Sequence, residues 1–304
     1  MKVSNLSPPD LAHRLARGEL ALRLSPFTAR IRSPLPVVAD AIARMYGEFP
    51  VVPADEFADF DVRVAPPAGL RRWFRPQVFF YFDERPSFRP LPADQAYPML
   101  EWGLNWCIAA HAHQFLIVHA AVIEKGGRAA LLPAPPGSGK STLCAGLVSR
   151  GWRLLSDELT LVDLATGAIH GMARPINLKN ASIDVIRAFW PDAAMTAPVH
   201  DTTKGTVALV RPPVESVRRV GETALPRWIV FPRWVADAPA EFKPMSKART
   251  CLTLAEQAFN YDIHGLRGFE AVTDLVDRCD CFDFSYGRLD DAVEAFADLA
   301  DRTP

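Results

Sequence analysis

The sequence feature that most constrains the fold is a glycine-rich segment at residues 134–141, which reads Ala-Pro-Pro-Gly-Ser-Gly-Lys-Ser. It fits the phosphate-binding pattern GxxxxGK[ST], except that Ala134 stands where the first glycine is usual. The segment follows an apolar strand pattern at 129–132 and precedes a helical pattern in which Leu143 and Leu147 share one face. Strand, loop and helix in this order predict an α/β domain that binds the phosphates of a nucleotide.

Such a loop works through backbone N–H groups that point inward around the phosphates, and Gly137 and Gly139 permit the dihedral angles that this requires. Lys140 adds a positive charge, Ser141 offers a hydroxyl to Mg²⁺, and the helix that follows directs its positive end at the phosphates. An ordinary glycine-rich turn with a surface lysine is the alternative. We expect ATP and Mg²⁺ as cofactors, with nucleotide contacts from Pro136, Gly137, Ser138, Gly139, Lys140, Ser141 and Thr142.

An acidic pair, Asp157 and Glu158, follows the strand pattern at 152–156. Phosphoryl transfer to a hydroxyl needs a magnesium anchor beyond the loop and a base that takes the acceptor's proton. Adjacent residues at a strand end point to opposite sides, so one carboxylate can face the metal and the other the acceptor. In the alternative interpretation, Asp157 caps a turn and Glu158 is solvated.

The order of these motifs resembles the HPr kinase/phosphorylase family and its HPr-kinase-related branch, which share a P-loop core with PEP carboxykinases. The resemblance covers residues 115–262 and rests on His119, the loop, the acidic pair and the segments 249–252 and 255–260. It implies an α/β P-loop kinase core of the HPr kinase/PEP carboxykinase type at 96–304, preceded by a smaller N-terminal α+β module at 1–95.

Carried over position by position, the resemblance implies that Asp157 is the base that activates the acceptor, with His119 close enough to share its proton. It also implies that Glu158 and Ser141 hold Mg²⁺ and that Arg249 stabilises charge on the transferring phosphoryl group. Because members of the family are oligomers, it further allows a homo-oligomer.

The chain departs from the family pattern at Ala134, at Glu158, where an aspartate is usual, and at 173–179, where a glycine-rich segment is usual. Within the last segment, Arg174 could contact phosphate or pair with a surface carboxylate. Lys204 lies in a turn-rich segment and could reach the γ-phosphate or the acceptor, and a solvated loop lysine is the alternative. We count Lys204 among the candidate catalytic residues.

Hydrophobic periodicity organises the remainder of the chain. Alternation around Pro26 predicts two strands within 20–32, helical spacing predicts a helix that ends near Gly47, and strand patterns return at 60–64 and 77–82. A long helix is expected within 92–114, then one strand at 115–124 that forms a hairpin with 128–132. A second hairpin is expected around 166–167, and an amphipathic helix at 289–299.

Composition restricts the function classes. The 34 basic and 35 acidic side chains leave a net charge of −1, which does not favour a nucleic-acid partner. There is neither an apolar run long enough to cross a bilayer nor a signal-peptide core at the N-terminus, so we expect no membrane partner and a cytoplasmic protein. Five scattered cysteines, an odd number, are typical of reduced thiols.

The sequence therefore predicts an ATP-dependent kinase that transfers the γ-phosphoryl group to a hydroxyl, with a serine of a protein or peptide as the favoured acceptor. A small hydroxylated molecule is the near alternative. The rival from another class is a nucleotide-dependent conformational switch or scaffold without phosphoryl transfer, and a PEP-carboxykinase-like enzyme is a third reading.

Overall fold

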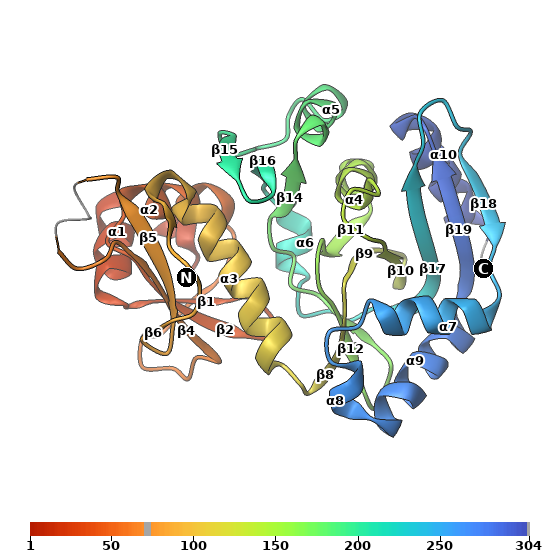
Figure 1. Ribbon diagram of the computed structural model, residues 1–304, viewed down its shortest axis with the longest axis horizontal. Helices are drawn as coiled ribbons and strands as arrows, with labels where there is room; N and C mark the ends of the chain where they lie inside the picture. Colours follow the sequence, from red (N-terminus) through yellow and green to blue (C-terminus); the bar gives the residue numbers. More distant parts are fainter. Residues whose placement is uncertain (70–73, 303–304) are drawn as a thin grey trace.

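The structure is a computed structural model that describes residues 1–69 and 74–302. Figure 1 shows two regions side by side: a smaller N-terminal sheet with its helices, and a larger region built around a central sheet. The chain passes from the first to the second through the long helix α3 (Ala96–His111). Strands and helices are mixed in both regions, so the fold is of the α/β type.

The elements of the N-terminal region are short. In chain order they are the 3₁₀ turn η1 (Val3–Asn5), α1 (Pro8–Arg17), β1 (Leu20–Arg23), β2 (Thr28–Arg32), α2 (Pro36–Met45), β3 (Val51–Val52), β4 (Phe60–Ala65), β5 (Gln77–Phe82), β6 (Arg85–Pro86), β7 (Leu91–Pro92) and the 3₁₀ turn η3 (Ala93–Gln95). The strands expected around Pro26, at 60–64 and at 77–82 are confirmed, and so is the helix that ends near Gly47.

Their strands form one sheet in the order β3-β1-β2-β4-β5-β6, with β7 paired to β5. Along β4, Val62 and Val64 are buried while Asp61 and Arg63 are partly exposed, which is the period of two of a strand with one covered face. The covered face packs on apolar side chains of α1, α2 and α3 in a single core.

Helix α3 belongs by its packing to this first core. Leu100 and Leu104 are fully buried against residues of the N-terminal sheet, and the same core continues into Leu161 and Leu209 of the larger region. The long helix expected within 92–114 is thus confirmed. The division of the chain at residue 95 stays a prediction, and the helix that follows it closes the N-terminal core.

The larger region contains the remaining elements. In chain order they are β8 (Phe115–Val118), β9 (Ala120–Lys125), β10 (Arg128–Pro133), α4 (Lys140–Ser149), β11 (Arg153–Ser156), β12 (Thr160–Asp163), β13 (Ile169–His170), β14 (Ile176–Lys179), α5 (Ala181–Phe189), β15 (Val199–Thr202), β16 (Gly205–Val210), α6 (Val214–Arg218), β17 (Leu225–Trp234), β18 (Glu241–Pro244), α7 (Lys247–Glu256), α8 (Tyr261–His264), α9 (Leu266–Arg278), β19 (Asp280–Tyr286) and α10 (Leu289–Asp301).

The central sheet has the order β11-β9-β10-β17-β19-β18, and β10, β17 and β19 run parallel. Leu131 and Leu132 of β10 are both fully buried because their side chains enter different cores. Leu132 packs with residues of α4 and α10, whereas Leu131 packs with residues of α9. Helices cover both faces of the sheet, which explains why its strands read as continuous apolar runs.

The strand expected at 115–124 is two strands in different sheets, so this expectation is wrong. The chain breaks at His119: β8 pairs with β12, whereas β9 pairs with β10 and β11. The break has a tertiary cause, because the His119 N–H donates to the carbonyl of Gln257 at 2.7 Å and the Phe259 N–H donates to the carbonyl of Ile117 at 2.8 Å. The hairpins β9–β10 and β12–β13 are confirmed.

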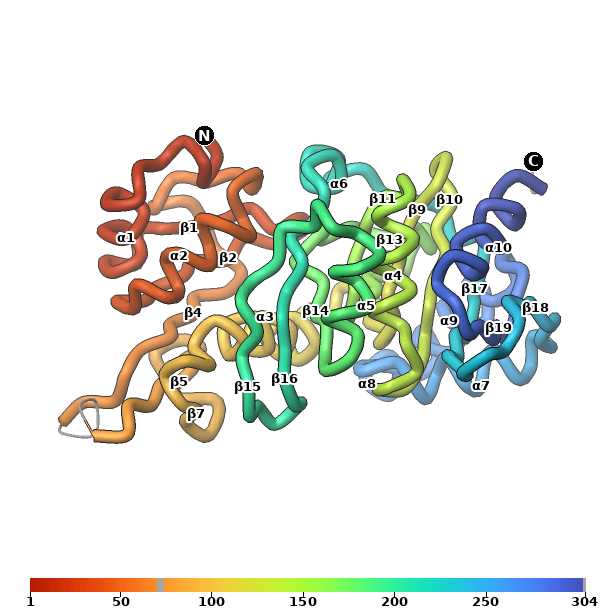
Figure 2. Tube along the Cα trace, turned by 90° about the horizontal axis from the view of Figure 1, so that it is seen from above, coloured from red at the N-terminus to blue at the C-terminus, as the bar shows by residue number. Residues whose placement is uncertain are grey.

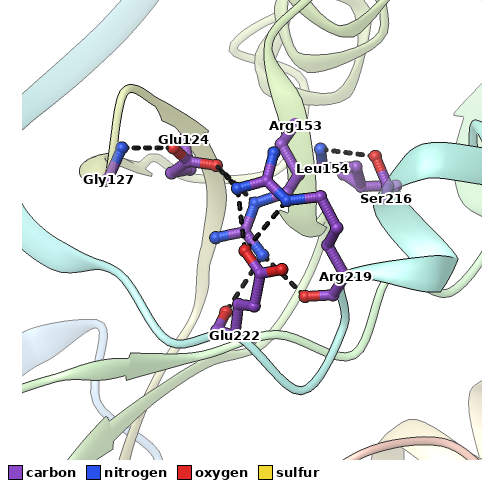
Figure 3. A network of polar contacts seen from close by, with 7 residues as sticks. All are labelled: Glu124, Gly127, Arg153, Leu154, Ser216, Arg219 and Glu222. Atoms are coloured by element: carbon purple, nitrogen blue, oxygen red, sulfur yellow. Dashed lines mark hydrogen bonds and ion pairs between the residues drawn. The ribbon is translucent and has the colours of Figure 1, made fainter.

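A buried polar network fixes the start of β11 (Figure 3). Arg153 pairs with Glu124 of β9, and the two side chains are 5% and 2% exposed. The Arg153 Nη1 also donates to the carbonyls of Arg219 and Glu222 at 2.8 and 3.0 Å, and Glu124 accepts the backbone N–H of Gly127. Both buried charges therefore have several partners.

In the described part of the chain, no helix combines the length and the apolar character needed to cross a membrane. All five cysteines are free thiols, as the sequence predicts, and four of them are buried.

Candidate functional site

The glycine-rich loop leaves the carboxyl end of β10 and turns into α4. Gly137 and Gly139 have φ angles of 87° and 88°, which L side chains rarely adopt, so both glycines are required by the backbone. A Cβ on Gly139 would lie 2.6 Å from the hydroxyl oxygen of Tyr286, and that hydroxyl donates to the Gly139 carbonyl at 3.0 Å. Ala134 is buried and has no positive φ, so its methyl group fits where the pattern has glycine.

The loop is open on its outer side. Pro136 and Gly137 are exposed, while the Ser138 carbonyl accepts the backbone N–H of Trp234 at 2.9 Å and so ties the loop to β17. The Ser138 hydroxyl is buried without a hydrogen-bond partner among the described residues. Thr142 is half-buried in the first turn of α4. The segment thus forms a tight glycine turn before α4 with an accessible face, and phosphate binding there stays a prediction.

Lys140 begins α4 and is 93% buried, since 7% of its surface is exposed. Its Nζ atom has no hydrogen-bond partner among the described residues. Burial lowers the pKa of Lys140, and the carboxylates of Asp157 and Glu158 oppose that change. A buried ammonium group with free donors requires an anion, which is the situation that a phosphate-binding lysine should show before its ligand arrives.

Asp157 follows β11 and is 4% exposed. One carboxylate oxygen, Oδ2, accepts the backbone N–H of Asn177 at 3.0 Å, while Oδ1 is buried without a partner among the described residues. Burial raises the pKa of Asp157 to about 6 and Glu158 adds to the increase, whereas Lys140, the Asn177 N–H and the Ser141 hydroxyl oppose it. The free oxygen therefore lies beside the loop, ready for a metal ion or a proton.

Glu158 points into a different environment. Its Oε2 accepts the side-chain amide of Asn105 at 3.2 Å, and its Oε1 lies 3.8 Å from the Nζ of Lys179. Burial acts to raise the pKa of Glu158, but Lys204, Lys179 and Lys140 together outweigh it, and the pKa lies below its ordinary value. Glu158 is thus an anion held among cations.

The two carboxylates lie in different surroundings, and the roles that the resemblance implies for them stay predictions. The Ser141 side chain lies close enough to Asp157 to lower the pKa of that carboxyl, whereas Glu158 contacts Asn105 and Lys179. Alternation along a strand predicts opposite sides without saying which residue takes which, and the β11–β9 ladder is irregular between Leu154 and Ser156, just before the pair.

Lys204 lies in the turn between β15 and β16, with its ammonium group 4.9 Å from the ring centroid of Trp102 on α3. Burial lowers its pKa, Glu158 opposes that change and Lys179 adds to it. Lys204 is exposed and lies close enough to Glu158 for that carboxylate to act on its pKa. Its catalytic role stays a prediction.

His119 lies at the break between β8 and β9, half-buried, with its ring centroid 5.7 Å from that of Phe259. Burial and then Lys140 lower the pKa of His119 to about 4, although Glu158 opposes them. The imidazole is therefore neutral at pH 7. The structure brings His119 to the charges around Glu158, where it can accept or donate a hydrogen bond.

Arg249 lies on the other side of the loop. It is an exposed residue of α7, pairs with Asp283 at 3.2 Å, and lines a cavity of about 350 Å³ together with Ala134 and Ser138 of the loop. The sheet order places this cavity beside β17 and β19, whereas the acidic pair follows β11 at the opposite edge. Arg249 is thus close to the loop, and its role at the phosphoryl group stays a prediction.

Arg174 neither lies on the loop nor pairs at the surface. It is 6% exposed and forms an ion pair at 2.6 Å with Glu101 of α3, whose other oxygen accepts the hydroxyl of Tyr46 at 2.7 Å. The Arg174 Nη1 also donates to the Oδ1 of Asn105 at 2.6 Å, and Asn105 holds Glu158. A chain of buried contacts thus links the N-terminal region to the acidic pair.

Sequence reasoning missed four residues of the site: Trp102, Asn105, Asn177 and Lys179. The first two lie on α3, where nothing but helical apolar spacing could be read. The other two belong to the segment 173–179, where the departure from the family pattern was the only signal. Among the described residues, no group of three or more histidine, cysteine or acidic side chains is placed so that it could hold a metal ion. Mg²⁺ at a phosphate site needs only one or two carboxylates besides the phosphates and water.

No family model matches the chain, and no curated protein matches it. Among solved structures, the chain is similar to the HPr(Ser) kinase/phosphatase from Coxiella burnetii. The two are 10% identical, the TM-score is 0.26, and the match covers 61% of this chain and 94% of that one. At this identity and TM-score the likeness assigns neither a family nor an activity, so the function has to be argued from the site.

Proposed function

We propose that this protein is an ATP-dependent phosphotransferase that moves the γ-phosphoryl group to a hydroxyl acceptor, with serine of a protein or peptide favoured and a small hydroxylated molecule as the alternative. One observation carries the proposal. The Nζ of Lys140 and the Oδ1 of Asp157 are buried beside an open glycine loop, and neither has a hydrogen-bond partner among the described residues. Buried polar atoms without partners are costly unless a ligand supplies them.

ATP fits this arrangement through its phosphates. The loop 136–142 and the N-terminus of α4 offer backbone N–H groups, and Lys140 supplies the charge. The cavity that contains Arg249 opens beside the same loop and leaves room for a nucleoside.

Mg²⁺ would bind through Asp157 and Ser141, because one buried oxygen of Asp157 has no partner among the described residues and the Ser141 side chain lies close enough to lower the pKa of that carboxyl. Held by these residues, Mg²⁺ would supply positive charge that neutralises the transferring group. The assignment made from the sequence gave the metal to Glu158 and the base to Asp157. The free oxygen of Asp157 beside Lys140, and the cations around Glu158, favour the exchange of these two roles.

Glu158 then faces the acceptor, with His119 beside it. Catalysis of phosphoryl transfer is mainly positioning and charge stabilisation, so a carboxylate with a low pKa still serves to orient the hydroxyl and take its proton late in the reaction. Asn105 and Lys179 hold that carboxylate in place.

Two variants separate the roles. Glu158→Gln should reduce phosphoryl transfer by about 10²- to 10⁴-fold, the usual range for loss of a general base, and leave the Mg²⁺ concentration for half-maximal activity unchanged. Asp157→Asn should raise the Mg²⁺ requirement at least tenfold and leave metal-free nucleotide binding within about threefold. Glu215→Gln, at an exposed position of α6, is the matched control. If instead Glu158→Gln raises the Mg²⁺ requirement and Asp157→Asn does not, Asp157 is the base and Glu158 the metal ligand, as the sequence analysis assigned them.

The reaction class is tested with γ-labelled ATP and fractionated cell extract. Label in the protein fraction supports a protein acceptor, and label in the small-molecule fraction supports the alternative. A protein that binds ATP·Mg²⁺ tightly but forms neither labelled product nor acceptor-dependent ADP would be a nucleotide switch, contrary to the proposal.

A further inference from the structure

Two lysines near Glu158 are not needed to bind ATP at the loop, where Lys140 already serves the phosphates. Lys179 ends β14 and places its Nζ 3.8 Å from the Glu158 carboxylate. Lys204 lies in the neighbouring turn, between β15 and β16 of the same small sheet. Both belong to the segment that lies between the acidic pair and the N-terminal region.

Helix α3 lies on the opposite side of the region that contains Lys179, Lys204 and Glu158. Trp102 lies under the ammonium group of Lys204, and Asn105 donates to Glu158 at 3.2 Å. The Gln95 side chain, just before α3, donates to the carbonyl of Asp201 at 3.2 Å and ties the β15–β16 hairpin to the helix. Figures 1 and 2 both show this hairpin between the N-terminal region and β14.

The charges on this side do not balance. Lys140 and Asp157 lie together at the loop, which leaves Lys179 and Lys204 with the single carboxylate of Glu158. The two ammonium groups therefore carry more positive charge than this one carboxylate offsets. An anionic group on the acceptor would supply the missing counter-charge beside the reacting hydroxyl, where charge stabilisation matters most.

We propose that the acceptor carries an anionic group, a carboxylate or a phosphate, which binds between Lys179 and Lys204 while its hydroxyl meets Glu158. This inference rests on the proposed phosphotransferase function. In the reaction the acceptor oxygen forms a bond to the γ-phosphorus, the bond from that phosphorus to the β,γ-bridging oxygen breaks, and the hydroxyl proton passes to Glu158. The products are ADP and a phosphate ester.

The test compares matched acceptors and matched variants. The probes are D-glycerate and glycerol 3-phosphate against neutral glycerol, and a peptide with Glu-Ser-Glu against one with Gln-Ser-Gln. The wild-type protein should use the anionic member of a pair at least tenfold better by kcat/KM. Preference among the small molecules indicates a metabolite, and preference between the peptides indicates an acidic protein segment.

Lys179→Met and Lys204→Met should each raise the KM for the anionic probe by about 10- to 100-fold, the range expected for one charge-assisted hydrogen bond. The KM for ATP should change by less than about threefold, and the loss in kcat/KM with the anionic probe should exceed the loss with the neutral probe at least tenfold. Lys125→Met, far along the chain in the β9–β10 hairpin, is the control. Equal losses with neutral and anionic probes, or a raised KM for ATP with unchanged preference, would assign these lysines to the γ-phosphate and overturn the proposal.

Binding distinguishes failure of this proposal from failure of the phosphotransferase function. Protein saturated with a non-hydrolysable ATP analogue and Mg²⁺ is titrated with glycerol 3-phosphate and with glycerol, by ligand-observed NMR. Binding of the anion that is lost in Lys204→Met supports the site even if no probe is phosphorylated. If the protein binds the ATP analogue but not glycerol 3-phosphate, the proposed anionic acceptor site is wrong. If the protein does not bind the ATP analogue, the phosphotransferase function itself is wrong.

Discussion

The buried charged groups at the two ends of strand β11 differ in how completely their polar atoms are hydrogen-bonded. At its start, Arg153 and Glu124 share an ion pair and both have further hydrogen bonds to the backbone (Figure 3). Just beyond its end, Asp157 keeps one oxygen without a partner, and the ammonium group of Lys140 has none among the described residues. The two places are similarly buried, so the difference lies in how completely each is satisfied.

A network in which every buried polar atom has a hydrogen-bond partner stabilises the fold and has no free donor or acceptor for a ligand. A cluster with buried atoms left open costs stability, and a protein retains such a cluster where a ligand completes it. The comparison therefore separates a structural ion pair from a candidate site by physical criteria alone. It also explains why Arg174, which is as buried as Arg153 and fully paired with Glu101, belongs to the scaffold of the site.

The largest change in the free energy of unfolding should come from removing Arg153, whose side chain is hydrogen-bonded to Glu124 and to backbone carbonyls at the start of β11. Arg153→Met leaves the buried Glu124 with only Arg219 as a cationic partner, 3.9 Å away, and should lower the free energy of unfolding by about 3–5 kcal/mol. Urea unfolding followed by circular dichroism measures it. Arg219→Met removes a half-exposed arginine whose ion pair with Glu222 lies at the surface, and should cost less than about 1 kcal/mol. Equal effects of the two variants would contradict the distinction.

A smaller change in the free energy of unfolding should come from a ligand that binds the unpartnered atoms of Lys140 and Asp157. ATP·Mg²⁺ at about 100 times its Kd should raise the free energy of unfolding by about 2.7 kcal/mol, because the ligand binds only the folded chain. Lys140→Met should remove most of that gain when nucleotide concentration is kept the same, and Lys125→Met should keep it. Thermal shift at several nucleotide concentrations reports both. A nucleotide that stabilises Lys140→Met as much as the wild type would mean that the loop lysine binds no phosphate.

The smallest effect concerns the stability of the ligand-free protein. The pKa of Asp157 is raised by burial to about 6, so between pH 4 and 6 the folded state holds a proton that the unfolded state has released. Stability from this group is therefore lost as pH rises through that window. Asp157→Asn should make the ligand-free protein about 1–3 kcal/mol more stable at pH 8, with no difference below about pH 4. If Asp157→Asn is less stable than the wild type at pH 8, the ionised Asp157 carboxylate has favourable partners in the folded protein, contrary to this prediction.

The sequence predicted those parts of the fold that depend on neighbours in the chain. The loop, the helix that follows it, both hairpins and the strands of the N-terminal sheet were all readable from periodicity and glycine placement. The strand expected at 115–124 was wrong because its break at His119 is imposed by backbone bonds from 257–260, far along the chain. No local pattern carries that information.

For the site, the residue types alone predicted a glycine loop with a lysine, a hydroxyl and two carboxylates, because backbone dihedral angles and charge are properties of the residues themselves. Only the tertiary structure decided which polar groups surround each carboxylate, and only it brought Asn105 to Glu158 across 53 residues of chain. It also buried Arg174 against α3 and set Lys179 and Lys204 around one anion. These outcomes depend on how elements pack in three dimensions, since burial and the partners it leaves are fixed by neighbours that are distant in sequence.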